Sequence, residues 1–68
     1  IPNPRGYINS AVLKTKLRKY NEALSDLKKA LELDPKNSDA YFGMSVVYDL
    51  IGEKSKAEKY RRMAEELK

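Results

Sequence analysis

The sequence contains no cysteine and no histidine. Their absence removes the commonest zinc ligands, thiol nucleophiles and proton shuttles that work near neutral pH. Ten carboxylates remain, but no pair of them lies in an apolar stretch that would raise a pKa toward neutrality. Glycine-rich phosphate loops, metal-ligand spacings and nucleophile motifs are also missing. The sequence therefore predicts a chain without catalytic residues, cofactor or metal.

Long apolar runs are absent as well. No segment approaches the roughly 18 apolar residues of a membrane-spanning helix, and the first residues show no signal-peptide pattern. A soluble chain is expected, with the cytoplasm as the favoured compartment. At 68 residues it makes one small domain, and a domain of this size buries only about 60% of its unfolded surface. We expect marginal stability.

The sequence repeats itself at an offset of 34 residues, half its length. The offset pairs aromatic with large apolar side chains and small with small ones, which is typical of solenoid proteins. The matched pairs are Tyr7 with Tyr41, Ile8 with Phe42, Ala11 with Ser45, Val12 with Val46, Leu13 with Val47, Leu17 with Ile51, Ala23 with Ala57, Ala30 with Ala64 and Leu33 with Leu67.

Apolar residues within each unit are three and four positions apart, which predicts amphipathic helices. Asn3 before Pro4 suits a helix start, Asn37 or Ser38 can cap a later one, and Gly52 can end it in a left-handed conformation. The expected helices span residues 5–18, 21–34, 38–51 and 54–67. Residues 1–4 are an expected lead-in, with one repeat over 5–35 and a second over 36–68.

Residues 17–24 (LRKYNEAL) and 29–35 (KALELDP) resemble the second half of a tetratricopeptide repeat (TPR). In that family small residues stand where the two helices of a hairpin meet, with an aromatic near the start of each first helix. The matching residues are Ala11, Ala23, Ala30, Ser45, Ala57 and Ala64, with Tyr7 and Tyr41 as the aromatics. The resemblance implies an all-α fold of two antiparallel hairpins stacked as a short right-handed solenoid. It also implies a protein–protein interaction module, an adaptor or scaffold.

The sequence departs from the family pattern at two positions. Arg18 stands where the second unit has Gly52, and Lys14 stands where it has Tyr48. A left-handed Arg18 would lose about 1 kcal/mol relative to glycine, and a displaced turn is the alternative. The competing interpretation of the whole pattern is a generic pair of helical hairpins.

The two units also differ on their outer faces. One stripe of the second expected helix carries Leu24, Leu27 and Leu31, whereas the fourth has Glu58, Arg61 and Glu65. Charges at a terminal helix keep it in water, so we expect the array to end there. Ser10 and Lys14 replace Met44 and Tyr48, so the first helix is expected to face solvent too.

The resemblance further implies a concave groove lined by the first helix of each repeat. The groove residues are Arg5, Ile8, Asn9, Val12 and Lys16 beside Phe42, Gly43, Val46, Asp49 and Leu50. Its apolar centre suits an extended segment or an amphipathic helix of a partner protein, and Gly43 leaves room for close approach. Ile8, Val12 and Gly43 replace the Lys and Asn residues that grip chaperone C-termini in one subfamily. No carboxylate-clamp binding is expected.

Two other functions remain open. Tyr60 and Met63 could serve self-association or docking within a larger assembly, with the groove filled by that parent or by a dimer mate. The excess of 14 basic over 10 acidic residues, net +4, favours acidic ligands and is modest for a nucleic-acid binder. The basic clusters are Lys14, Lys16, Arg18 and Lys19, and Lys54, Lys56, Lys59, Arg61 and Arg62. The aromatic residues are read as core.

Overall fold

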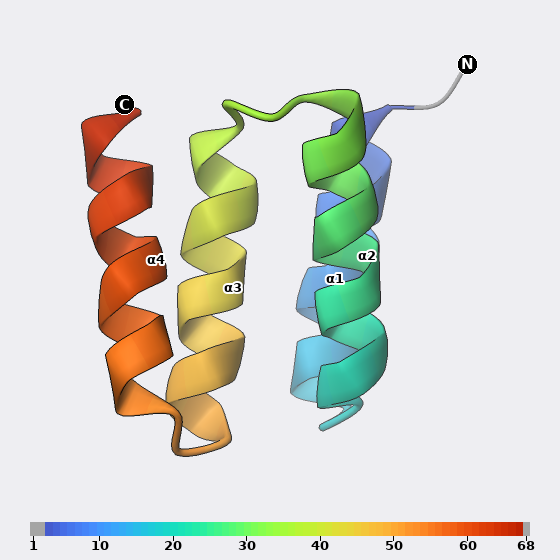
Figure 1. The fold of residues 1–68 in the computed structure, drawn as a ribbon. Coiled ribbons are helices and arrows are strands. Elements are labelled where there is room, and N and C mark those ends of the chain that lie inside the picture. The colour runs from blue at the N-terminus through green and yellow to red at the C-terminus, as the bar shows by residue number, and fades with distance from the viewer. Residues whose placement is uncertain (1–2, 68) are drawn as a thin grey trace.

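Four helices make up the protein in the computed structural model, which describes residues 3–67 (Figure 1). They are α1 (Pro4–Lys16), α2 (Tyr20–Leu33), α3 (Ser38–Leu50) and α4 (Lys54–Glu66). The all-α prediction is confirmed, and each helix ends one or two residues before its expected end. Residues 1, 2 and 68, assigned above to the lead-in and the second repeat, lie outside the described residues.

Asparagine caps the first helix of each repeat. The Asn3 side chain accepts a hydrogen bond from the Arg5 backbone N–H at 2.9 Å, and Pro4 occupies the first helical turn. The Asn37 side chain accepts one from the Ala40 N–H at 3.0 Å. Each bond satisfies a backbone donor that has no partner within the helix. The caps lie 34 residues apart, so the repeat extends to the helix starts.

The turns inside the two hairpins have the same backbone geometry. Arg18 has φ 62° and Gly52 has φ 88°, both in the left-handed region. Beyond them, the Lys19 N–H donates to the Lys14 carbonyl at 2.8 Å and the Glu53 N–H donates to the Tyr48 carbonyl at 2.8 Å. These six-to-one bonds define a Schellman ending of the helix. The first turn is therefore not displaced, and Arg18 takes the conformation that favours glycine.

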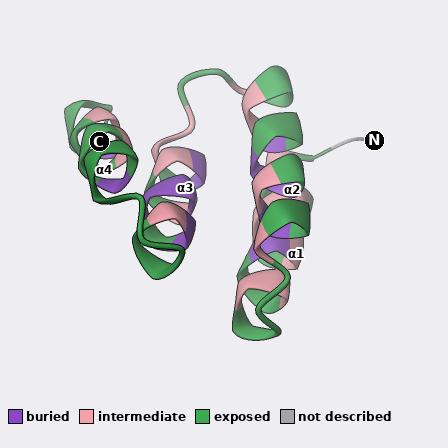
Figure 2. Ribbon diagram, turned by 60° about the horizontal axis from the view of Figure 1, so that its bottom comes forward, coloured by how far each residue is buried: buried purple, intermediate pink, exposed green. Residues whose placement is uncertain are grey.

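The helices pack in chain order as two antiparallel hairpins, α1 with α2 and α3 with α4, and α2 joins the hairpins by packing on α3 (Figure 1). Buried residues lie on the sides of the helices that face one another (Figure 2). Small side chains at these contacts let the helix axes come close. The small buried residues are Ala11, Ala23, Ala30, Ala40, Ser45, Ala57 and Ala64.

The interior of the second hairpin is aromatic. Tyr60 stacks between Tyr41 and Tyr48, with ring centroids 6.1 and 5.5 Å apart. Offset stacking of this kind adds about 0.5–1.5 kcal/mol per pair beyond the buried area. Tyr7, Lys14 and Asp26 occupy the equivalent positions of the first hairpin, so the same space is filled there by a polar group.

Asp26 is the centre of that polar group. Its side chain accepts a hydrogen bond from Ser10 Oγ at 2.8 Å and forms an ion pair with Lys14 Nζ at 2.8 Å. The expectation that Ser10 and Lys14 make a solvent-facing side of α1 is wrong, because both side chains turn toward α2 and bind this buried carboxylate. A buried charge persists only when it is paired and hydrogen-bonded.

The leucine stripe of α2 and the charged stripe of α4 differ in burial. Leu27 is buried and packs at the contact with α3, with Leu24 and Leu31 half-buried beside it. Glu58, Arg61 and Glu65 are exposed on α4, which packs only on α3 among the described residues. None of the helices within residues 3–67 has the length and apolar content needed to cross a membrane.

Candidate binding groove

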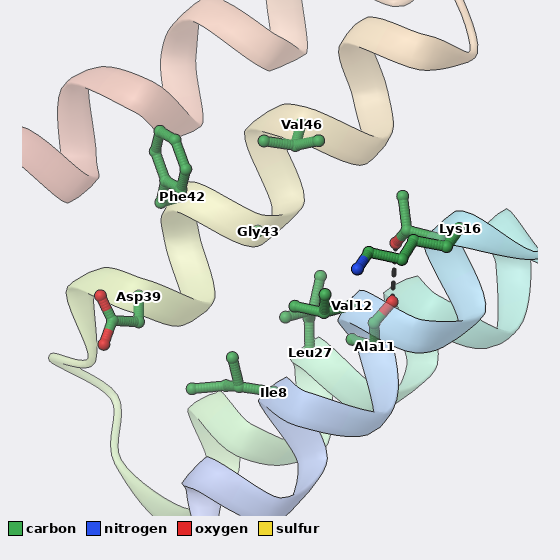
Figure 3. A pocket seen from close by; sticks show the side chains of 10 residues that line it. Ile8, Ala11, Val12, Lys16, Leu27, Asp39, Phe42, Gly43 and Val46 are labelled. Carbon is green, nitrogen blue, oxygen red and sulfur yellow. Dashed lines mark hydrogen bonds between the residues drawn. The ribbon is translucent and has the colours of Figure 1, made fainter.

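A cavity of about 390 Å³ opens between the first helices of the two hairpins (Figure 3). One wall comes from α1, the other from α3, and Leu27 of α2 forms the floor. Cavities of this size hold a small ligand or a few side chains of a larger one. Its lining residues are Ile8, Ala11, Val12, Thr15, Lys16, Leu27, Asp39, Phe42, Gly43 and Val46.

Helical spacing puts the apolar lining on facing sides of α1 and α3. Ile8 and Val12 are four residues apart, as are Phe42 and Val46, so each pair projects from one side of its helix. Val12, Phe42 and Val46 remain 49%, 56% and 38% exposed. Three neighbouring large apolar side chains are thus exposed to water beside one cavity.

Gly43 lies where the two repeats meet. A Cβ atom at this position would lie 2.9 Å from Leu27 Cδ2 and 3.3 Å from Leu27 Cδ1. Leu27 is fully buried, so the space that Gly43 leaves is occupied by a side chain of α2. The room expected there for a ligand is thus largely taken by the protein itself, and Gly43 serves close packing of the repeats.

Polar atoms contribute little to the centre of the groove. The Thr15 hydroxyl donates to the Ala11 carbonyl at 2.7 Å, the bond drawn in Figure 3, so its hydrogen is already satisfied within α1. Buried polar side-chain atoms without a partner are absent from residues 3–67. The centre of the groove is therefore apolar, and its polar atoms already have partners within the protein.

Two opposite charges stand at the ends of this apolar centre. Asp39, at the start of α3, and Lys16, at the end of α1, lie on opposite sides of the labelled side chains (Figure 3). Neither forms a salt bridge with another residue of the described part of the chain.

The structure gathers six of the expected groove residues around the cavity, namely Ile8, Val12, Lys16, Phe42, Gly43 and Val46. Asn9 and Arg5 instead line a neighbouring, more polar hollow together with Asp39. Asp49 and Leu50 continue the same side of α3, one turn beyond the cavity. Asp49 is paired with Lys54 at 2.7 Å, and this contact and the Lys54 charge hold the pKa of its carboxyl below the ordinary value.

Four lining residues were not expected there. Ala11 is expected at a helix contact and Leu27 on the leucine stripe of the second helix, and the structure shows that both also form the floor of the groove. Asp39 lies three residues before Phe42 on α3, and Thr15 lies three residues after Val12 on α1, so each is one helical turn from an expected groove residue. Helical periodicity alone contained that signal, because Asp39, Phe42 and Val46 are three and four positions apart.

Comparison with known families agrees with the geometry. The tetratricopeptide repeat profile matches residues 4–37, and a second tetratricopeptide repeat profile matches residues 27–59. The chain belongs to the tetratricopeptide repeat family. Domains of this family are non-catalytic modules that bind other proteins. A search of curated proteins gave no significant match.

Proposed function

We propose that the groove between α1 and α3 holds a segment of a partner protein that inserts apolar side chains against Val12, Phe42 and Val46. The exposure of these three side chains around one cavity carries the proposal. Removing them from water contributes about 25 cal/mol for each Å² of apolar surface buried. An extended strand or an amphipathic helix both offer side chains at the spacing required.

The groove is rigid before the partner arrives. Its walls are helices that pack into the domain through Ala11 and Ser45, both buried, and its floor includes the buried Leu27. Only the partner segment then loses conformational entropy on binding. A cavity of about 390 Å³ covers a few side chains, so we expect a dissociation constant in the micromolar range.

Asp39 and Lys16 give the groove a polarity. A bound segment with a basic residue at the Asp39 end and an acidic residue at the Lys16 end would meet both charges. Exposed ion pairs contribute only about 0–1 kcal/mol, so they set orientation and partner choice more than affinity. Exchanging the charges with Lys16→Asp and Asp39→Lys is expected to favour peptides of the opposite charge order.

The direct test is peptide-library panning on the immobilised domain beside a groove variant, Phe42→Glu with Val46→Glu. The matched control is Leu33→Glu with Leu67→Glu, which makes the same charge change at two apolar side chains outside the groove. Circular dichroism checks that both variants keep the helicity of the parent. Peptides held by the parent and the control but not by the groove variant support the proposal.

The other outcomes point to different functions. Equal capture by all three proteins, or no capture at all, would contradict groove binding and favour self-association or docking in a larger assembly. Peptides whose capture falls steeply with salt would favour an acidic ligand, because an apolar site has a shallow salt dependence.

The lining also predicts which peptides are not held. Ile8 and Val12 provide no charge or amide for a terminal carboxylate. We expect amidation of the C-terminus to leave the affinity of captured peptides unchanged. Loss of binding on amidation would show that a carboxylate is read after all.

A further inference from the structure

The outer face of α1, formed by Gly6, Leu13 and Leu17, carries two exposed leucine side chains. Leu13 is 61% exposed and Leu17 is 60% exposed, the two largest values among the big apolar side chains of residues 3–67. A Cβ added at Gly6 would meet nothing within 4 Å. Leu13 is seven residues from Gly6 and four from Leu17, so the three lie on one side of α1. This side differs from the groove side of Ile8 and Val12 and from the side on which Ser10 and Lys14 reach α2.

The repeat shows what covers the corresponding face of α3. Residues 34 positions later are Ala40, Val47 and Ile51, and the first two are buried. Both helices of the first repeat contact α3, with α2 making the larger contact, and Leu27 of α2 reaches the α3 backbone at Gly43. The equivalent faces of α1 and α3 therefore differ in their surroundings: α2 covers the face on α3, whereas the face on α1 is exposed to water.

We propose that the outer face of α1 is a stacking surface for an α2-type helix of a further hairpin. That helix runs antiparallel to α1 and presents aliphatic side chains three and four residues apart, as Leu24, Leu27 and Leu31 do. Stacking then continues the α2–α3 interface by one step and removes Leu13 and Leu17 from water. The inference is independent of what the groove holds.

A second folded copy of this chain does not supply such a helix. The leucine stripe of α2 is already covered by α3 of its own chain. The equivalent stripe of α4 carries Glu58, Arg61 and Glu65, all exposed, and these charges would lose water against Leu13. The molecule is therefore open for stacking at α1 and closed at α4, so growth of the array is directional.

Asn9 restricts the occupant further. It stands where α3 has Gly43, the residue that admits Leu27. An incoming helix with a full leucine at the middle position would collide with the Asn9 side chain. The fitting partner has a small residue there, with aliphatic residues on both sides of it.

The test joins a donor hairpin to the intact chain at either end. In the upstream fusion, residues 1–37 carrying Leu27→Ala are followed directly by residues 4–68, so that Asn37 takes the capping place of Asn3. In the downstream fusion, residues 1–68 are followed by residues 35–37 and then by residues 4–37 with the same substitution. Both fusions have the same added hairpin and differ only in the face on which it can stack.

We expect the upstream fusion to melt more than about 5 °C above the parent chain and the downstream fusion to show no such gain. Leu13→Lys with Leu17→Lys in the recipient repeat should remove the gain. The same pair in the parent alone should leave its melting temperature nearly unchanged, because both side chains are already exposed.

Two results would overturn the proposal. Equal melting of the two fusions, or a gain that survives the double lysine substitution, would show that the outer face of α1 does not receive the hairpin. A parent chain that sediments as a dimer, and becomes a monomer on the double lysine substitution, would assign the face to a second copy.

Discussion

Asp26 on α2 lies 2.8 Å from the Lys14 ammonium on α1, where the second repeat has Tyr60 stacked on Tyr48. The same helix contact is thus made once by an ion pair with a hydroxyl and once by two rings. The stability of the polar contact depends on the Asp26 carboxylate keeping both of its partners, Ser10 and Lys14. The stability of the aromatic contact depends on the apolar surface that the two rings bury. The consequences of removing one partner therefore differ between the hairpins.

Replacing only Asp26 by alanine leaves Ser10 and Lys14 without their partner in a half-buried place. We expect this to lower the free energy of unfolding by about 1–3 kcal/mol in urea titrations. The triple exchange Ser10→Met, Lys14→Tyr and Asp26→Tyr installs the residues of the second repeat. It is expected to be neutral or stabilising by up to about 4 kcal/mol, as when buried ion pairs are replaced by packed apolar groups. A triple variant less stable than the single one would show that the two hairpins do not have equivalent interiors.

Acid should weaken the first hairpin through the same carboxylate. Burial alone would raise the pKa of Asp26, but hydrogen bonds from Lys14 and Ser10 and the charges of Lys14 and Lys29 lower it below its ordinary 3.8. A carboxyl with a depressed folded pKa stabilises the protein above its unfolded pKa, and that stability is lost as the pH falls through the folded pKa. The gap in unfolding free energy between the parent and Asp26→Asn should therefore be full at pH values well above 3.8 and shrink below it. A gap independent of pH would contradict a charged Asp26.

Arg18 offers a simple gain in stability. Its φ of 62° places a residue with a Cβ atom in the left-handed region, at a cost of about 1–2 kcal/mol relative to glycine. Arg18→Gly also makes the unfolded chain more flexible, so we expect a net gain of about 0.5–1 kcal/mol. Thermal melting should shift upward by about 4–8 °C for each kcal/mol. The control Lys19→Gly, at a residue with φ −92°, should bring no gain.

The sequence was sufficient for the fold and for part of the site. The offset of 34 residues, the capping asparagines and the small residues at helix contacts predict the hairpins, because each signal is local or periodic. The Asp26 group was missed because Ser10 and Lys14 look like surface residues until a carboxylate 16 or 12 positions away is placed opposite them. Leu27 under the groove was missed because it joins two repeats. Helical periodicity predicts which side of a helix is apolar but does not determine the distance between two packed helices.

The helix contacts through alanine should resist enlargement. Ala23 and Ala30 are fully buried on α2. Leucine at either position would force the helices apart or into strained rotamers and lower stability by about 1–3 kcal/mol. Ser25→Leu, an exposed position on the same helix, is the control and should leave the melting temperature nearly unchanged. Unchanged melting of both alanine variants would contradict the observed pairing of the helices.

Gly43 and Gly6 provide a matched pair for testing how the repeats join. Alanine favours a helix over glycine by about 1 kcal/mol, and a Cβ at Gly6 meets nothing within 4 Å, so Gly6→Ala should raise the unfolding free energy. A Cβ at Gly43 would lie 2.9 Å from Leu27 Cδ2, and Leu27 is too buried to move aside, so Gly43→Ala should be about 1–3 kcal/mol less stable than Gly6→Ala. In a Leu27→Ala background the contact is gone, and Gly43→Ala should become stabilising. Urea denaturation of the four variants measures this coupling, and additive effects of Gly43→Ala and Leu27→Ala would refute a direct contact between the two repeats at this point.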